Sequence, residues 1–154
     1  MRRELEGLPE EVVGLLAPFF PGFDLARIRI REGIPFYVRG NPIGYADRDR
    51  IYFEPGAYRL DTIEGLSLLA HEIAHCMQYR ALGTWRFRLR YLRFYFENRW
   101  QGMSRGEAYL NIPFEIEARE MEARVHLALR RLQREMLRRE HRAPDRSRAV
   151  FFTE

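Results

Sequence analysis

Two kinds of hydrophobic spacing divide the chain into a mixed N-terminal part and a longer helical part. Residues 10–19 carry apolar side chains at helical spacing, and a Pro-Gly pair ends the run, which predicts a first short helix. From Ala26 the pattern alternates, with Ile28 and Ile30 between arginines, as is typical of a strand with one buried face. We therefore expect a short helix and then strands before the main helical region.

Two further segments of the N-terminal part have the composition of strands. Residues 35–38 and 50–53 are rich in aromatic and β-branched side chains, and residues 47–49 are polar turn formers that lead into the second segment. These segments predict a small antiparallel sheet near the N-terminus. Together with the helices that follow, they indicate an α+β fold.

The main helix of the chain is expected to begin near Asp61. Asp61 can cap this helix, and Glu64 stands three residues later, as in a capping box. Further along, apolar residues recur on one side of the helix, namely Leu66, Leu69, Ile73 and Met77. This side is predicted to face the core.

Residues 84–100 combine arginines with aromatic side chains. Such a mixture could bind nucleic acid or a membrane surface. Helical spacing favours packing instead, with one stripe covering the core and arginines on another face: Trp85, Leu89, Leu92 and Phe96 against Arg86, Arg90 and Arg93. An excess of exposed aromatic residues would then mark a cleft wall or a partner site.

A long helix is predicted from Pro113 to about residue 139. Proline suits a first helical turn, and apolar residues follow at helical spacing: Phe114, Ala118, Met121, Val125 and Leu132. Residues 140–154 are rich in arginine and lack this period until the last few positions, which predicts a flexible tail. Residues 1–139 are expected to form a single domain, because this length suits one hydrophobic core.

Composition narrows the class of protein. The 26 basic residues are all arginine and face 22 acidic ones, so a net charge of +4 makes a nucleic-acid binder only a minor hypothesis. The single cysteine, Cys76, allows no internal disulfide and is expected to be a small buried residue. No apolar stretch follows the first residues, since acids are interleaved among them, so we expect neither a signal peptide nor a membrane span there. We therefore expect a cytoplasmic protein, with export by a dedicated machine left open.

The strongest chemical signal is the sequence His71-Glu72-Ile73-Ala74-His75 within the main helix. Residues four apart lie about 40° from each other around a helix, so the two imidazoles share a face away from the apolar side. Two such histidines, with a glutamate after the first, are the ligand pair and general base of a zinc hydrolase. The sequence thus predicts Zn²⁺ bound by His71 and His75, with Glu72 as the catalytic base.

A catalytic zinc site needs one more protein ligand and an open position for water. Glu115 and Glu117, at the start of the long helix, are the candidates. They lie about 90° and about 70° to either side of that helix's apolar stripe, so helical phase does not decide between them. Glu120 and Glu122 are expected to be solvated, and His126, about three turns further along, is expected at the solvent edge.

The segment that contains these two glutamates resembles the second half of a gluzincin site. In gluzincins a helix after the H-E-x-x-H helix supplies a glutamate in a Glu-x-x-Ala or Glu-x-x-Ser setting, and Glu115 is followed by Ala118 three residues later. The resemblance implies that Glu115 is the third ligand, with Glu117 as the alternative.

A closer resemblance covers residues 8–80, about half of the chain. Its matching pieces are the strand around Ile28, residues 50–58, and residues 62–78, which include the H-E-x-x-H sequence. They resemble a metallopeptidase domain that often accompanies bacterial extracellular contractile injection systems. The resemblance implies a zincin-like fold, a peptidase activity, and a bacterial partner or export machinery. The chain departs from the usual pattern with Cys76-Met77, a change expected to affect packing only.

The expected function is a zinc-dependent peptidase that acts on a peptide or protein substrate. Glu72 would take a proton from the attacking water, and a tyrosine hydroxyl would stabilise the oxyanion, with Tyr109 as first candidate and Tyr79 as second. An extended peptide could pair with the edge of the sheet. The alternative is a catalytically inactive zincin-like module that binds a partner or docks an effector.

Overall fold

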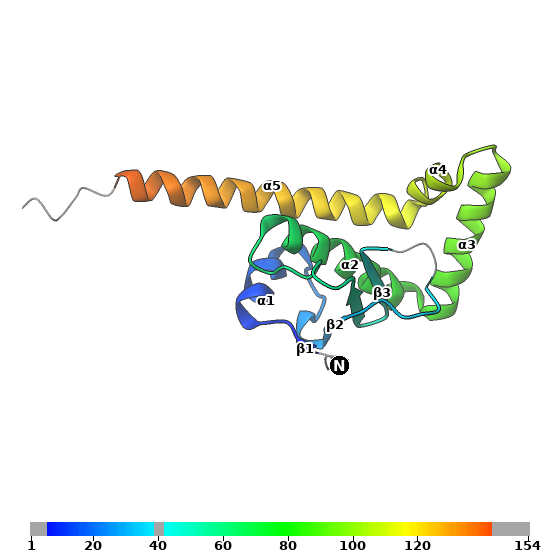
Figure 1. Ribbon diagram of the computed structural model, residues 1–154, viewed down its shortest axis with the longest axis horizontal. Helices are drawn as coiled ribbons and strands as arrows, with labels where there is room; N and C mark the ends of the chain where they lie inside the picture. The colour runs from blue at the N-terminus through cyan, green and yellow to red at the C-terminus, as the bar shows by residue number, and fades with distance from the viewer. Residues whose placement is uncertain (1–5, 39–41, 143–154) are drawn as a thin grey trace, which may run out of the picture.

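The computed structural model describes residues 6–38 and 42–142, which form an α+β fold (Figure 1). A small sheet and a short helix come first, and the C-terminal half is mainly helical. The expected fold class is confirmed. Within the described residues, no helix is long and apolar enough to cross a membrane. Most of the expected tail, from residue 143 to residue 154, lies outside the described residues.

The sheet is mixed rather than purely antiparallel. Its order is β1-β2-β4-β3. The strands are β1 (Glu6–Gly7), β2 (Arg29–Glu32), β3 (Gly44–Asp47) and β4 (Arg50–Phe53). The pairs β1–β2 and β3–β4 are antiparallel, but β2 and β4, the two strands that were predicted, are parallel. The difference arises because the second strand of the β3–β4 hairpin, not the first, lies beside β2, which leaves β3 at the edge.

The strand expected at residues 35–38 is wrong. This segment forms a turn, and the side chain of Phe36 is 97% exposed, so its aromatic composition does not reflect burial. Two strands were not predicted: β1, which has only two residues, and β3, whose sequence Gly-Tyr-Ala-Asp has little strand character. The turn expected at residues 47–49 is present, with Arg48 in the left-handed region at a φ of 59°.

The main core lies between the sheet, the N-terminal helices and the apolar side of the main helix. It includes the first helix, α1 (Glu10–Leu16), and two short 3₁₀ segments, η1 (Ala17–Phe19) and η2 (Leu25–Arg27). Its fully buried side chains include Leu16, Phe20, Ile28, Ile51, Phe53, Leu69, Ile73, Cys76 and Val125. The predicted apolar side of the main helix thus faces the core, and the cysteine is buried among its members, as expected.

The main helix is α2 (Ile63–Leu82), and its cap is Thr62 rather than Asp61. The Thr62 hydroxyl accepts a hydrogen bond from the Gly65 amide at 3.0 Å. Asp61 instead forms an ion pair with Arg59 at 3.0 Å. The expected cap was wrong by one residue because Asp61 has a cationic partner and Thr62 takes the capping position.

Three helices follow α2. Gly83, at a φ of 78°, allows a sharp turn from α2 into α3 (Thr84–Trp100). The short helix α4 (Arg105–Leu110) then leads into α5 (Pro113–Arg142), which begins at the predicted proline and extends three residues beyond the predicted end. α5 packs along α2 and continues past it, whereas α3 leads away from α2 towards α4 (Figure 1).

The face of α3 that was expected to cover the core is exposed. Trp85, Leu89, Leu92 and Phe96 are all exposed to solvent. The side that packs inward carries Phe87, Tyr91, Phe94 and Tyr95, which belong to a second cluster built with Tyr79, Ile112 and Phe114. Both sides of α3 are apolar at helical spacing, so the period could not show which one faces inward.

Replacing Gly65 by alanine is expected to lower the free energy of unfolding by about 1 to 3 kcal/mol. A Cβ atom at position 65 would lie 1.8 Å from the Arg59 carbonyl oxygen, so the backbone would have to move. Gly14→Ala is the matched control: a Cβ there meets no atom within 4 Å, so alanine in α1 should be stabilising by about 0.5 to 1 kcal/mol. Urea unfolding of both variants checks the pair, and equal destabilisation would contradict this account.

Candidate metal centre

The packing of α5 against α2 brings His71, His75 and Glu115 together. The two imidazoles lie four residues apart on α2, with their rings edge to face and 5.0 Å between centroids. The Glu115 carboxylate, from the first turn of α5, lies 3.5 Å from His71 Nε2 and 3.3 Å from His75 Nε2. The three donor groups all lie within 4.8 Å of one another and could hold a metal ion.

Each imidazole is held by a second partner at its other nitrogen. His71 Nδ1 donates to Glu122 Oε2 at 3.0 Å, and His75 Nδ1 donates to Gln78 Oε1 at 2.8 Å. Glu122 was expected to be solvated, but its side chain is only 38% exposed and contacts His71, because α5 places it about two helical turns beyond Glu115 on the side that faces α2. Sequence spacing within α5 alone does not reveal this contact.

The orientation of Gln78 determines which nitrogen of His75 carries a proton. The Gln78 amide nitrogen donates to the Phe114 carbonyl oxygen and to Glu117 Oε2, both at 3.0 Å. Its amide oxygen must therefore be the atom that accepts from His75 Nδ1. A neutral imidazole with a proton on Nδ1 has its lone pair on Nε2, the atom that faces Glu115.

The donor set therefore suits a metal cation. Both Nε2 atoms and a carboxylate point towards one another, and both Nδ1 atoms have acceptors, as the histidine ligands of metal sites do. The structure brings Glu115 rather than Glu117 to the two imidazoles. Glu117 holds Gln78 in place, so its contact with the site is indirect.

The charges of the triad also favour a cation at this position. Burial lowers the pKa of His71, but hydrogen bonds to Glu115 and Glu122 outweigh this effect and raise it to about 9. Burial raises the pKa of Glu115, but the two imidazoles hold it well below its ordinary value. The buried carboxylate thus requires a neighbouring positive charge, which a metal ion would supply in place of a proton.

Glu72 lies beside the triad, on the side of α2 that faces strand β3. Its side chain is buried, and burial raises its pKa to about 7. Its carboxylate packs against the backbone of Gly44: a Cβ atom at position 44 would lie 2.4 Å from Glu72 Oε1. The edge strand and this carboxylate are therefore in direct contact.

Two tyrosines adjoin the Glu115 carboxylate. The Tyr91 hydroxyl donates to Glu115 Oε1 at 2.7 Å, a contact that was not predicted from the sequence. The only signal for it was its place on the aromatic helix α3. Tyr109, the first candidate for oxyanion donor, interacts with both Glu115 and Tyr91, and burial together with the Glu115 charge raises its pKa well above its ordinary value.

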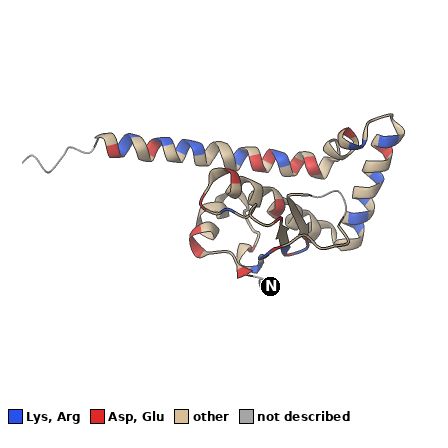
Figure 2. Cartoon of the chain, in the orientation of Figure 1, with Lys and Arg blue, Asp and Glu red and all other residues tan. Residues whose placement is uncertain are grey.

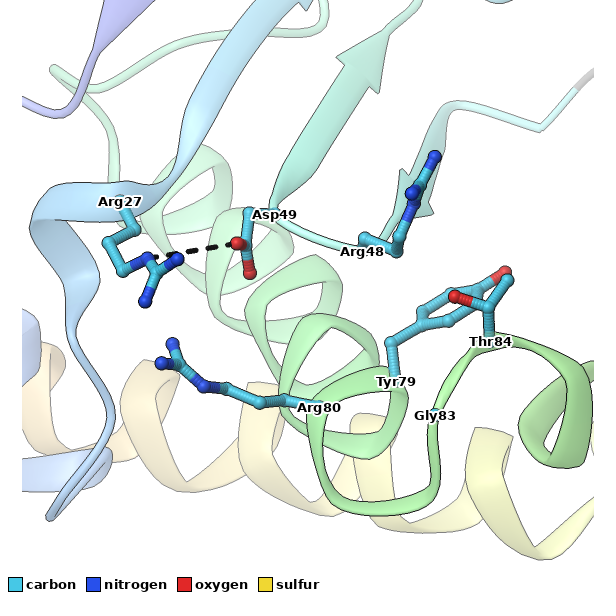
Figure 3. Close-up of a pocket in the computed structure, with 7 residues that line it drawn as sticks. All are labelled: Arg27, Arg48, Asp49, Tyr79, Arg80, Gly83 and Thr84. Carbon is cyan, nitrogen blue, oxygen red and sulfur yellow. Dashed lines mark ion pairs between the residues drawn. The ribbon is translucent and has the colours of Figure 1, made fainter.

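Tyr79, the second candidate, lies elsewhere. Its hydroxyl interacts with Arg88, and its side chain lines a separate pocket with Arg27, Arg48, Asp49, Arg80, Gly83 and Thr84 (Figure 3). No residue of the triad lines that pocket. His126 is also apart from the triad, since its Nδ1 lies 3.4 Å from the Ser67 hydroxyl, as expected for a histidine that is not a ligand.

Replacing Glu122 by alanine is expected to weaken metal affinity by about 10- to 100-fold, because His71 would lose the acceptor that orients it. Glu120→Ala is the matched control, since Glu120 is an exposed acid on the same helix outside the triad. Calorimetric titration of chelator-treated protein with Zn²⁺ measures both variants. Equal affinities in the two variants would contradict a supporting role for Glu122.

Comparison with known proteins identifies a family for the first half of the chain. A search of curated proteins and a search of solved structures each find no match. The family model for the eCIS core domain, the core domain of extracellular contractile injection systems, matches residues 7–83, half of the 154 residues. This span includes His71, Glu72 and His75, while Glu115 lies beyond it. The chain belongs to the eCIS core domain family.

Proposed function

We propose that the chain is a zinc-dependent peptidase in which His71, His75 and Glu115 hold the metal and Glu72 is the general base. The observation that carries the proposal is the convergence of two Nε2 atoms and one carboxylate beside a buried glutamate of the same helix. This convergence joins Glu115 to histidines that lie 40 and 44 positions earlier in the sequence. Helical spacing alone accounts for the two histidines but not for Glu115.

The donor set favours zinc. Two imidazoles and one carboxylate are three protein ligands, which is the usual number at catalytic zinc sites. Zinc bound there would supply Lewis-acid activation of a water molecule and of a carbonyl group. Glu115 is held for this task by the Tyr91 hydroxyl, and the imidazoles are held by Glu122 and Gln78.

Glu72 would move the proton. One of its carboxylate oxygens would accept a proton from the water that attacks the peptide carbonyl, and the same oxygen would then pass it to the leaving amine. Contact with Gly44 and burial restrict the carboxylate to one position beside the triad. Such a fixed position favours proton transfer, because misplacement by 1 Å can cost about 100-fold in rate.

The Tyr109 hydroxyl is the proposed donor to the developing oxyanion. Its side chain adjoins Glu115 from the short helix α4 and is 41% exposed, so a bound substrate could reach it. Tyr91, which is less exposed, positions the Glu115 carboxylate through its hydrogen bond and is the weaker candidate for contact with substrate.

The edge strand supports a peptide as the substrate. β3 pairs with β4 on one side only, so an extended chain could add to its other edge through main-chain hydrogen bonds. Because Gly44 of β3 touches the Glu72 carboxylate, a peptide bound along β3 would pass close to the proposed base. Membership of the eCIS core domain family supports a bacterial injection system as the partner or exporter of the protein.

Replacing Glu72 by glutamine is expected to lower kcat by about 10²- to 10⁴-fold, because the base is lost while the site keeps its shape. The assay follows a mixture of internally quenched peptides, with zinc content measured in parallel. Glu64→Gln is the matched control, since Glu64 is an exposed acid in the first turn of the same helix. Chelation should abolish wild-type hydrolysis, and added Zn²⁺ should restore it. Zinc-loaded protein that cleaves no peptide would favour the docking-module alternative.

Replacing Gly44 by alanine is expected to lower kcat on the order of 100-fold while zinc affinity stays within about threefold of wild type. The new methyl group would overlap Glu72, to which the three atoms nearest to it all belong, and Glu72 is not one of the proposed metal ligands. Gly106→Ala is the matched control, because a Cβ there meets no atom within 4 Å. Unchanged hydrolysis by the Gly44 variant would contradict a role for Glu72 in its observed position.

A further inference from the structure

Helix α3 carries an apolar stripe that no described part of the chain covers. The stripe consists of Trp85, Leu89, Leu92, Phe96 and Trp100, each more than half exposed, and Trp100 is 93% exposed. Exposed apolar surface of this extent is unusual on a protein and marks an interaction site. Neither the fold nor the candidate metal centre makes use of it.

The stripe lies on the outer side of the molecule. Its five residues fall within about 80° of one another around the helix. Phe87 and Tyr91 lie on the opposite side of α3, where they pack against the body of the protein. From Trp85 to Trp100 the stripe runs for about 22 Å. It is therefore a straight, convex ridge rather than a groove.

Arginines border the stripe on both sides. Figure 2 shows basic positions all along α3, and Glu97 is its only acidic residue. The arginines are Arg86, Arg90 and Arg93 along one border and Arg88 and Arg99 along the other. Within the described residues, Arg86 and Arg90 have no ion-pair partner. The charge around the stripe is thus strongly positive and only partly compensated.

We propose that α3 binds the surface of an anionic lipid bilayer, with the stripe inserted at the level of the headgroups. A helix with Trp, Phe and Leu on one face and arginines beside them has the composition of an interfacial helix. Tryptophan at both ends suits this depth, because its indole ring is amphipathic. An anionic bilayer provides phosphate groups on both sides of an inserted ridge, where the arginines lie.

Other occupants fit the stripe less well. Two copies of α3 packed stripe to stripe would bring like-charged arginine borders together. Nucleic acid would satisfy the arginines but would leave Leu89 and Leu92, at the centre of the stripe, without a suitable contact. A protein partner would need a groove with carboxylates along both of its walls.

The two tryptophans allow a direct test, because they are the only ones in the chain and both belong to the stripe. Vesicles of phosphatidylglycerol and phosphatidylcholine should shift tryptophan emission to shorter wavelength, and the protein should sediment with them. Pure phosphatidylcholine vesicles should produce a much smaller effect. Neither readout requires a bound metal or a peptidase activity, so the result stands apart from that of the proposed function.

Variants identify the surface that binds. Leu89→Glu and Leu92→Glu should each weaken vesicle binding about tenfold or more, because an inserted leucine is lost. Leu132→Glu, at an exposed leucine of α5, is the matched control and should bind as wild type does. Replacing both Arg86 and Arg90 by glutamine should weaken binding to the anionic vesicles by about fivefold for each arginine.

Three results would overturn the proposal. The first is the absence of both emission shift and sedimentation with anionic vesicles. The second is an emission shift that grows with protein concentration without vesicles, which would assign the stripe to a second copy of the chain. The third is equal loss of vesicle binding in the Leu89, Leu92 and Leu132 variants, which would show that α3 is not the surface involved.

Discussion

The structure depends on one contact, the burial of the Glu115 carboxylate between α2 and α5. Removing a carboxylate from water costs several kcal/mol unless partners compensate for it. Here two imidazoles and a tyrosine hydroxyl surround the carboxylate. α2 provides the imidazoles, α5 the carboxylate and α3 the hydroxyl, so the three longest helices meet at one charged group. The same contacts therefore determine both how these helices pack and where the donor atoms of the candidate metal centre lie.

α2 serves the core and the site with opposite faces. Leu69 and Ile73 are fully buried on the core side, which leaves little freedom for the helix to rotate or slide. The positions of the two histidines on the other side of α2 are fixed as a result. The Gln78 amide also fixes α2 relative to α5, because it links His75 to the backbone of the first turn of α5 and to Glu117. A fixed acceptor at each Nδ1 keeps the imidazole oriented with its Nε2 lone pair directed into the site, which is the preorganisation that a metal site needs.

Local regularity explains which features could be predicted from the sequence. The shared face of His71 and His75 follows from helical geometry alone, and so does the apolar side of α2. Glu115 could be selected over Glu117 only through the gluzincin resemblance, because helical phase left both open. Glu122 and Tyr91 were missed because their contacts depend on how α5 and α3 pack, which no spacing within one helix encodes. The position of β4 between β2 and β3 could not be predicted for the same reason, since the order of strands in a sheet depends on tertiary packing.

The contact between Gly44 and Glu72 has a consequence for how related sequences can diverge. A side chain at position 44 and a glutamate buried at position 72 compete for the same space. In family members that keep both strand and helix in this arrangement, glycine at position 44 and glutamate at position 72 should occur together. Where the glutamate is replaced by a smaller residue, larger residues should be tolerated at position 44. An alignment that shows a larger residue at position 44 together with a glutamate at position 72 would mark a member whose edge strand has moved. Paired substitution at two positions 28 residues apart would thus distinguish members that keep the proposed base from those that have lost it.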